Sequence, residues 1–120
     1  MTDIEESIRA AGPSSAGLLV VERKGDETAL GYCGLIDSGR GPQEPELAYE
    51  FLRRFWGQGY ATEASLAVMD WARSLAHVRL WAHVWDWNTG SRRVLSKLGF
   101  TESEREEAIY GTNLVTTRRL

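Results

Sequence analysis

Two glycines one residue apart mark the place where this sequence could do chemistry. Gly57 and Gly59 stand in RFWGQGYATEA, between a strand-like run and a helix-like run. Glycine permits a sharp turn and lets another group approach the backbone closely. The first amides of a helix are unpaired and carry partial positive charge, so this turn predicts a phosphate site at residues 57 to 62. Arg53 and Arg54 add positive charge nearby.

The same turn has other interpretations. A strand-to-helix turn can need glycine for its dihedral angles alone, and this segment by itself leaves the two interpretations equally open. A P-loop would require G-x-x-x-x-G-K-[ST], which the sequence lacks. The dinucleotide fingerprint G-x-G-x-x-G fits poorly, because Thr62 occupies its last position and antiparallel-looking strands come first.

The elements that precede the turn are predicted to be strands. Leu18–Gly25 and Ala29–Asp37 flank the turn signal KGDE, which predicts an antiparallel hairpin. In Glu46–Leu52 the residues alternate, with Leu47, Tyr49 and Phe51 pointing one way and Ala48 and Glu50 the other.

Helices and strands alternate after the turn. Apolar residues of YATEASLAVMDWARSLA recur at helical spacing and predict an amphipathic helix. Val78–Trp87 predicts a strand, NTGSRRVLSKLGF a second helix that ends at Gly99, and the remaining residues two strands around Gly111. The unit strand, GQG, helix, strand implies a crossover that joins two parallel strands. The sequence therefore predicts a mixed α/β (α+β) sheet.

Composition limits the function classes. The chain has 120 residues, which suits one domain, and a net charge of -3, which argues against nucleic acid as a partner. No run is long enough to span a membrane, and the acidic start lacks the apolar core of a secretory signal. Cys33 is the one cysteine, so no internal disulfide can form, which suits a cytoplasmic location. No residues show metal-ligand spacing, so we expect no metal.

Two motifs together resemble those of one enzyme family. RFWGQGYATEA resembles the acyl-CoA-binding pattern [RQ]-x-x-G-x-[GA] of the GNAT superfamily of N-acetyltransferases, through Arg54, Gly57 and Gly59. NTGSRRVLSKLGF follows after one helix and one strand, and the pair is most similar to the RimJ/RimL-like branch, which acetylates the N-termini of ribosomal proteins. The resemblance covers Leu18 to the C-terminus.

The resemblance implies a fold and a cofactor. The fold would be a mostly antiparallel mixed sheet whose central parallel strands splay apart, flanked by helices, in a single acyl-CoA-binding domain over residues 1–120. Family members begin with a further strand and helices that help to bind the acceptor, whereas only MTDIEESIRA stands here. The N-terminal part of the fold is therefore expected to be missing. A shortened sheet exposes an edge or face, which is compatible with a homodimer.

Acetyl-CoA would lie, by the same resemblance, in the cleft between strands 46–52 and 78–87. The implied cofactor-binding residues are Phe51, Leu52, Arg53, Arg54, Trp56, Gly57, Gln58, Gly59, Tyr60, Ala61, Thr62, Asn88, Ser91 and Arg92. Asn88 also has a purely structural interpretation, since it precedes a helix and can cap it.

Transfer of an acetyl group to an amine would require a base, because alkyl amines have a pKa of about 10.4 and are protonated at neutral pH. Glu50 is the first candidate, on the strand beside the thioester, although glutamate at such a position is more often solvent-facing. His83 on the facing strand is the second, and it can equally be a hydrogen-bonded residue of the sheet. Ser96 could assist the leaving thiolate, or lie on a helix surface. A backbone N–H near Phe51 to Arg53 could stabilise the oxyanion.

The function expected from these residues is direct transfer of an acetyl group from acetyl-CoA to a primary amine, either a protein N-terminus or a small molecule. Two alternatives stay open: a catalytically weak acyl-CoA-binding module, and an interaction domain whose GQG turn is structural.

Overall fold

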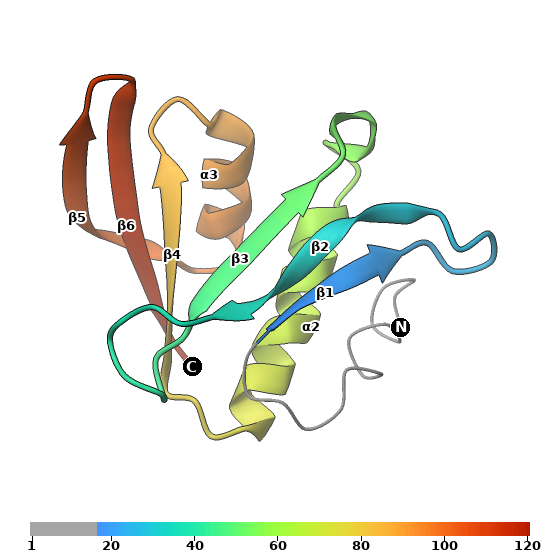
Figure 1. Cartoon of the computed structure of the whole chain (residues 1–120), viewed down its shortest axis with the longest axis horizontal. Helices are drawn as coiled ribbons and strands as arrows, with labels where there is room; N and C mark the ends of the chain where they lie inside the picture. Colours follow the sequence, from blue (N-terminus) through green and yellow to red (C-terminus); the bar gives the residue numbers. More distant parts are fainter. Residues whose placement is uncertain (1–16) are drawn as a thin grey trace.

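The computed structural model describes residues 17–120, which form a mixed sheet with two α-helices (Figure 1). The expectation about the N-terminal part of the fold concerns residues outside this range. The strands are β1 (Gly17–Glu22), β2 (Ala29–Ile36), β3 (Glu46–Phe51), β4 (Arg79–Trp85), β5 (Thr101–Ala108) and β6 (Gly111–Arg119).

The six strands are ordered β1-β2-β3-β4-β6-β5. Every neighbouring pair is antiparallel except β3 and β4, which run parallel. The predicted fold class, a mostly antiparallel mixed sheet with one parallel central pair, is confirmed. A short 3-10 helix, η1 (Arg53–Phe55), follows β3 and was not expected from the sequence.

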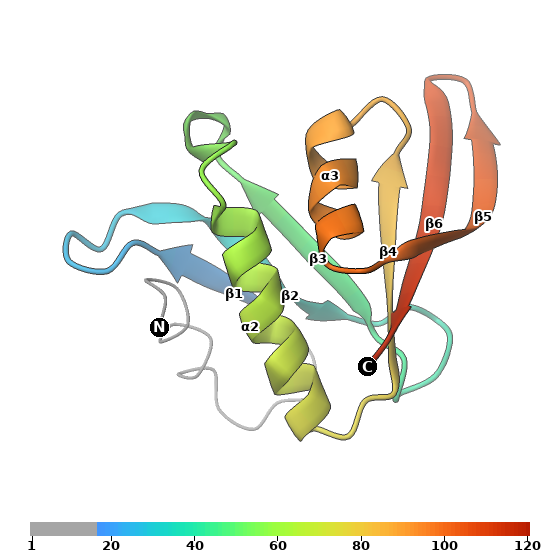
Figure 2. The ribbon, with the colours of Figure 1, turned by 180° about the vertical axis from the view of Figure 1, so that it is seen from behind.

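The helices α2 (Tyr60–Ser74) and α3 (Thr89–Lys97) both lie on one face of the sheet, the face toward the viewer in Figure 2. Helix α2 buries Ala64, Val68, Met69 and Ala72 against β2 and β3, as its apolar stripe predicts. Each large apolar side chain buried in this way contributes about 1.5–3 kcal/mol to stability.

The opposite face of the sheet is covered by no helix among residues 17–120 (Figure 1). On β3 the alternation of the sequence divides the side chains between the two faces. Leu47 and Phe51 are buried on the helix side, whereas Glu50 is exposed on the other side, which we call the open face. The hydrophobic core therefore lies between the sheet and the two helices.

Candidate active site

The parallel strands β3 and β4 meet at one end and separate toward the other. Glu46 and Trp81 form the one registered pair between them, and the Trp81 N–H donates to the Pro45 carbonyl at 3.0 Å. Beyond this pair the strands diverge, while β3 stays paired with β2 and β4 stays paired with β6 (Figure 1). A parallel pair that separates leaves backbone groups on both facing edges without a ladder partner.

A cavity of about 130 Å³ occupies the space between the diverging strands. Its wall consists of residues from β2, β3, β4 and α3: Tyr32, Glu46, Leu47, Ala48, Tyr49, Ala82, His83, Ser91 and Leu95. Two predicted site residues, His83 and Ser91, are thus brought together here, from opposite sides of the sheet.

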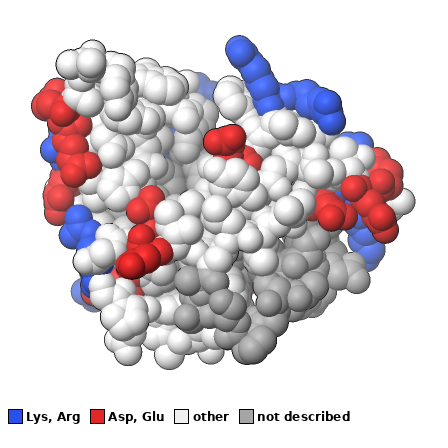
Figure 3. Space-filling model, in the orientation of Figure 1, with Lys and Arg blue, Asp and Glu red and all other residues white. Residues whose placement is uncertain are grey.

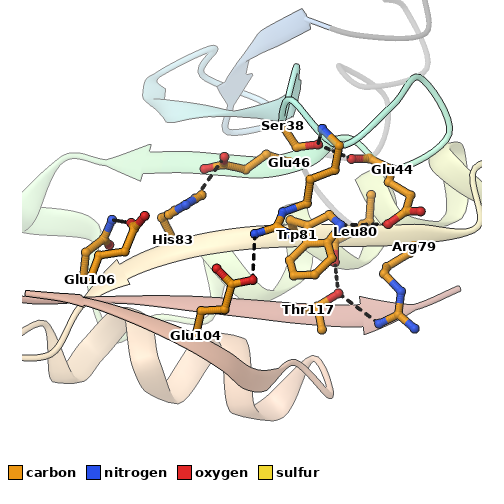
Figure 4. A network of polar contacts seen from close by, with 12 residues as sticks. Ser38, Glu44, Glu46, Arg79, Leu80, Trp81, His83, Glu104, Glu106 and Thr117 are labelled. Carbon is orange, nitrogen blue, oxygen red and sulfur yellow. Dashed lines mark hydrogen bonds and ion pairs between the residues drawn. The ribbon is translucent and has the colours of Figure 1, made fainter.

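On the open face, the cavity wall contains an imidazole and a carboxylate in contact. His83 Nδ1 lies 3.0 Å from Glu46 Oε1, and the two side chains are 33% and 17% exposed (Figure 4). A carboxylate that accepts the Nδ1 proton leaves Nε2 as the nitrogen able to take up a proton. This pair can therefore act as a base toward a group on the open face.

On the helix side, the cavity wall contains two hydroxyl groups in contact. Tyr49 Oη lies 2.7 Å from Ser91 Oγ, which joins β3 to the start of α3. Burial raises the pKa of Tyr49 to about 12, so its hydroxyl stays protonated at neutral pH. Tyr49 can thus donate a hydrogen bond but is a weak acid.

The N-terminus of α2 is open to the outside. Gly57 and Gly59 have φ of 75° and 85°, values that glycine adopts without strain, and a Cβ at either position would meet no atom within 4 Å. The first helical hydrogen bond runs from Glu63 N to Gly59 O, so the amides of residues 60 to 62 have no acceptor within the helix. Glycine at these positions therefore permits the positive φ angles and also leaves the backbone amides accessible. The turn can be structural and an anion site at the same time.

Hydrogen bonds from two side chains brace this turn. Trp56 Nε1 donates to Phe51 O at 2.7 Å, and Gln58 Nε2 donates to Arg54 O at 3.0 Å. Positive side chains (blue) project at the upper right of Figure 3, where the segment between β3 and α2 lies, and the basic residues of this segment are Arg53 and Arg54. The geometry suits an anion at the helix N-terminus.

The other predicted cofactor residues have identifiable structural roles. Asn88 Oδ1 accepts from Ser91 N at 3.1 Å and caps α3, which is the structural interpretation that the sequence left open. Arg92 donates to the Asp86 carbonyl at 3.0 Å. The backbone N–H of Leu52 donates to the Leu30 carbonyl. Of the N–H groups near Phe51 to Arg53 that could stabilise an oxyanion, this one already has an acceptor.

Two predicted catalytic residues do not line the cavity. Glu50 is exposed on β3, on the open face beyond Glu46, and Ser96 is exposed on α3. The sequence did not identify Glu46 or Tyr49 as residues of the site. The period of ELAYEFL extends to Glu46, which lies on the face of Glu50, but the position of His83 opposite it depends on the pairing of β3 with β4.

Other reactive groups give no second site in the described part of the chain. Cys33 is buried, and burial raises the pKa of its thiol to about 12, so it is not a nucleophile at neutral pH. Residues 17–120 contain no group of three His, Cys, Asp or Glu side chains that could hold a metal. No helix in this range has the length and apolar character needed to cross a membrane.

Comparison with known sequences supplies a family. The family described as "Acetyltransferase (GNAT) domain" matches residues 2–101. A protein of Bacillus subtilis, the uncharacterised YkkB, is 35% identical over 89 residues, which cover 72% of this chain and 52% of that protein. The chain thus spans about half the length of this curated relative.

Comparison with solved structures shows the same fold. A GCN5-related N-acetyltransferase from Kribbella flavida aligns over 96% of this chain and 76% of its own, with a TM-score of 0.80 and 19% identity. The ribosomal-protein-S5-alanine acetyltransferase from Vibrio fischeri covers 87% of this chain and 61% of its own, with a TM-score of 0.78 and 20% identity. The putative acetyltransferase yncA from Salmonella typhimurium was solved with its cofactor acetyl-CoA. It aligns over 87% of this chain and 64% of its own, with a TM-score of 0.74 and 20% identity.

Proposed function

The chain belongs to the GNAT acetyltransferase family, and on this basis we propose that it is an acetyl-CoA-dependent N-acetyltransferase that acts on a primary amine by direct transfer. The observation that carries the proposal is the cavity between the diverging strands β3 and β4, beside the open N-terminus of α2. One cleft could then hold the thioester from the helix side and admit an amine from the open face.

The residues at the head of α2 fit the pyrophosphate of acetyl-CoA. Gly57 and Gly59 leave room at the backbone, the amides of residues 60 to 62 supply donors, and Arg53 and Arg54 supply positive charge. A helix N-terminus favours an anion through its free N–H groups and its dipole. The Salmonella protein of the same fold was solved with acetyl-CoA as its cofactor, which supports this assignment. Ser91 and Asn88 would then lie beside the pantetheine arm.

The reaction needs three things from the chain. A base must remove a proton from the amine, because an alkyl ammonium with a pKa of about 10.4 cannot attack. A backbone N–H on the free edge of β3 would stabilise the charge that develops on the carbonyl oxygen. The thioester and the amine must also be held in contact. The cleft could do this by binding the thioester from the helix side and the amine from the open face.

The acceptor is a protein N-terminus or a small amine in this proposal. The two motifs together support the RimJ/RimL-like branch in this proposal. We further propose a cytoplasmic location, since the sequence has a single cysteine. A homodimer would cover the edge strand β1, whose Leu18 and Val20 are exposed.

Titration calorimetry with acetyl-CoA, followed by measurement of CoA release with a panel of amines, tests the proposal. We expect binding, and release of CoA with at least one amine. Binding without turnover on any amine would favour the alternative, a catalytically weak acyl-CoA-binding module. Absence of binding would favour an interaction domain and refute the assignment of the α2 N-terminus.

A further inference from the structure

We propose that Glu46 positions His83, and that His83 Nε2 is the base that deprotonates the amine. This inference rests on the proposed function and names the residues that carry out its proton transfer. It starts from the contact of 3.0 Å between His83 Nδ1 and Glu46 Oε1 at the wall of the cavity.

Strand pairing on both sides fixes the backbone of Glu46. Glu46 is paired with Ile36 of β2 on one side and with Trp81 of β4 on the other, at the point where the parallel strands begin to separate. Its side chain is 17% exposed, so few other orientations are open to it. His83 stands two residues beyond Trp81 on the same face of β4, and the carboxylate therefore meets the imidazole where the cleft opens.

The contact determines which nitrogen can act. A carboxylate oxygen 3.0 Å from Nδ1 favours a proton on that nitrogen, and the neutral imidazole then presents the lone pair of Nε2. The His83 side chain is one-third exposed, so a substrate amine can reach its Nε2 from the open face. A base oriented in this way keeps the tautomer that a proton acceptor needs.

The surroundings favour His83 over Glu50 as the base. Glu50 is on the same face but exposed, and it does not line the cavity. Charged groups near the pair have other partners: Arg40 stacks on Trp81 and pairs with Glu104, and Glu106 accepts from Asn113 (Figure 4). These contacts leave His83 with Glu46 as the paired proton-transfer group at the cavity.

The proton and the bonds balance in a single transfer. The amine nitrogen attacks the thioester carbonyl carbon, so an N–C bond forms and the C–S bond breaks. The ammonium first gives one proton to His83 Nε2, which frees the lone pair for attack. The nitrogen loses its second proton to solvent as the tetrahedral intermediate collapses, and the sulfur leaves with its electron pair as a thiolate. His83 then returns its proton to the solvent, and the thiolate is protonated, which restores the neutral imidazole and gives free CoA.

A spectroscopic measurement tests the positioning role without requiring turnover. Nitrogen-15 NMR of the histidine rings of the whole chain reports which nitrogen carries the proton, and Glu46→Ala should shift His83 from the Nδ1-protonated toward the Nε2-protonated tautomer. Glu46→Gln, which preserves the shape, should shift it less, because its amide oxygen can still accept. Glu106→Gln removes one negative charge from the same face and should leave the tautomer unchanged.

Steady-state kinetics tests the catalytic role of His83, with an amine that gives CoA release in the panel described above. His83→Ala should lower kcat by about 10²–10⁴-fold, the range for a general base, and leave the KM for acetyl-CoA within about twofold. Added imidazole should restore part of this rate. Glu46→Ala should lower kcat by about 10- to 100-fold, as loss of an orienting partner does, with Glu46→Gln intermediate. Thermal unfolding confirms that each variant is folded.

Different failures point to different errors. An unchanged tautomer in Glu46→Ala, or an unchanged kcat in His83→Ala, overturns this inference and leaves the proposed function standing. A large loss of kcat in Glu50→Gln alone would assign the base to Glu50 and also overturn it. If the wild-type chain binds no acetyl-CoA, the proposed function fails and takes the catalytic role of His83 with it.

Discussion

The pyrophosphate assignment can be tested at Gly59 with a matched control elsewhere in the chain. Gly59→Glu places a side chain and a negative charge at the head of α2, where nothing lies within 4 Å of the Cβ position. Gly39→Glu makes the same substitution in the loop between β2 and β3, also with nothing within 4 Å. The φ angles of the two glycines are 85° and 78°, so the two variants differ mainly in location.

The cost in stability should be similar for the two variants. A residue other than glycine in the left-handed region loses about 1–2 kcal/mol, and the open space at both positions adds no steric cost. The cost in affinity should differ. A hydrogen bond from an amide to a charged phosphate contributes about 1.5–3 kcal/mol. A carboxylate about 4 Å from a phosphate adds about 1 kcal/mol of repulsion in water.

Gly59→Glu should therefore lose about 2.5–4 kcal/mol of binding free energy, which corresponds to about 60- to 700-fold weaker binding of acetyl-CoA. Gly39→Glu should bind as the wild-type chain does. Titration calorimetry measures the affinities, and urea unfolding without ligand measures the stabilities. Equal affinities in the two variants, at matched stability, would mean that the head of α2 does not hold the pyrophosphate.

Two further predictions concern the hydroxyl pair and the cap of α3. Burial raises the pKa of Tyr49 to about 12, so the folded protein holds this proton more tightly than the unfolded chain and stability falls as the pH rises from about 10 to 12. Urea unfolding across this range should show a steeper loss in the wild-type chain than in Tyr49→Phe, and parallel curves would contradict the burial. Asn88→Ala should lower the free energy of unfolding by about 0.5–2 kcal/mol through loss of the bond to Ser91 N, whereas Asn88→Asp should preserve it. An equal loss in both would show that capping is not its role.

The local features of the site could be read from the sequence because they depend on neighbours in the chain. Glycine at 57 and 59 is required by the positive φ of a turn, and the helix that follows shows its buried face in its spacing. The alternation in ELAYEFL likewise separates Leu47 and Phe51 from Glu50 without reference to any other strand. Period and turn chemistry are local properties, and they were sufficient for a mixed α/β sheet, whereas the splayed central pair was implied by the family resemblance.

The contacts that define the cavity depend on pairing between distant segments. Tyr49 and Ser91 are 42 residues apart and meet because α3 packs on the helix side of the diverging strands. Glu46 meets His83 because β3 and β4 are joined by a single registered pair and then separate. A shift of one residue in that register would move the side chains of a strand to the opposite face.

The sequence by itself thus determined the strands and the two α-helices, the glycine turn and the family resemblance, since each depends on residues close together in the chain. Only the tertiary structure decided which of the candidate bases faces the cavity, and that Glu46 and Tyr49 share it. The physical reason is that a proton can be transferred only between groups in hydrogen-bond contact, and strand register and helix packing bring such groups together from distant parts of the sequence.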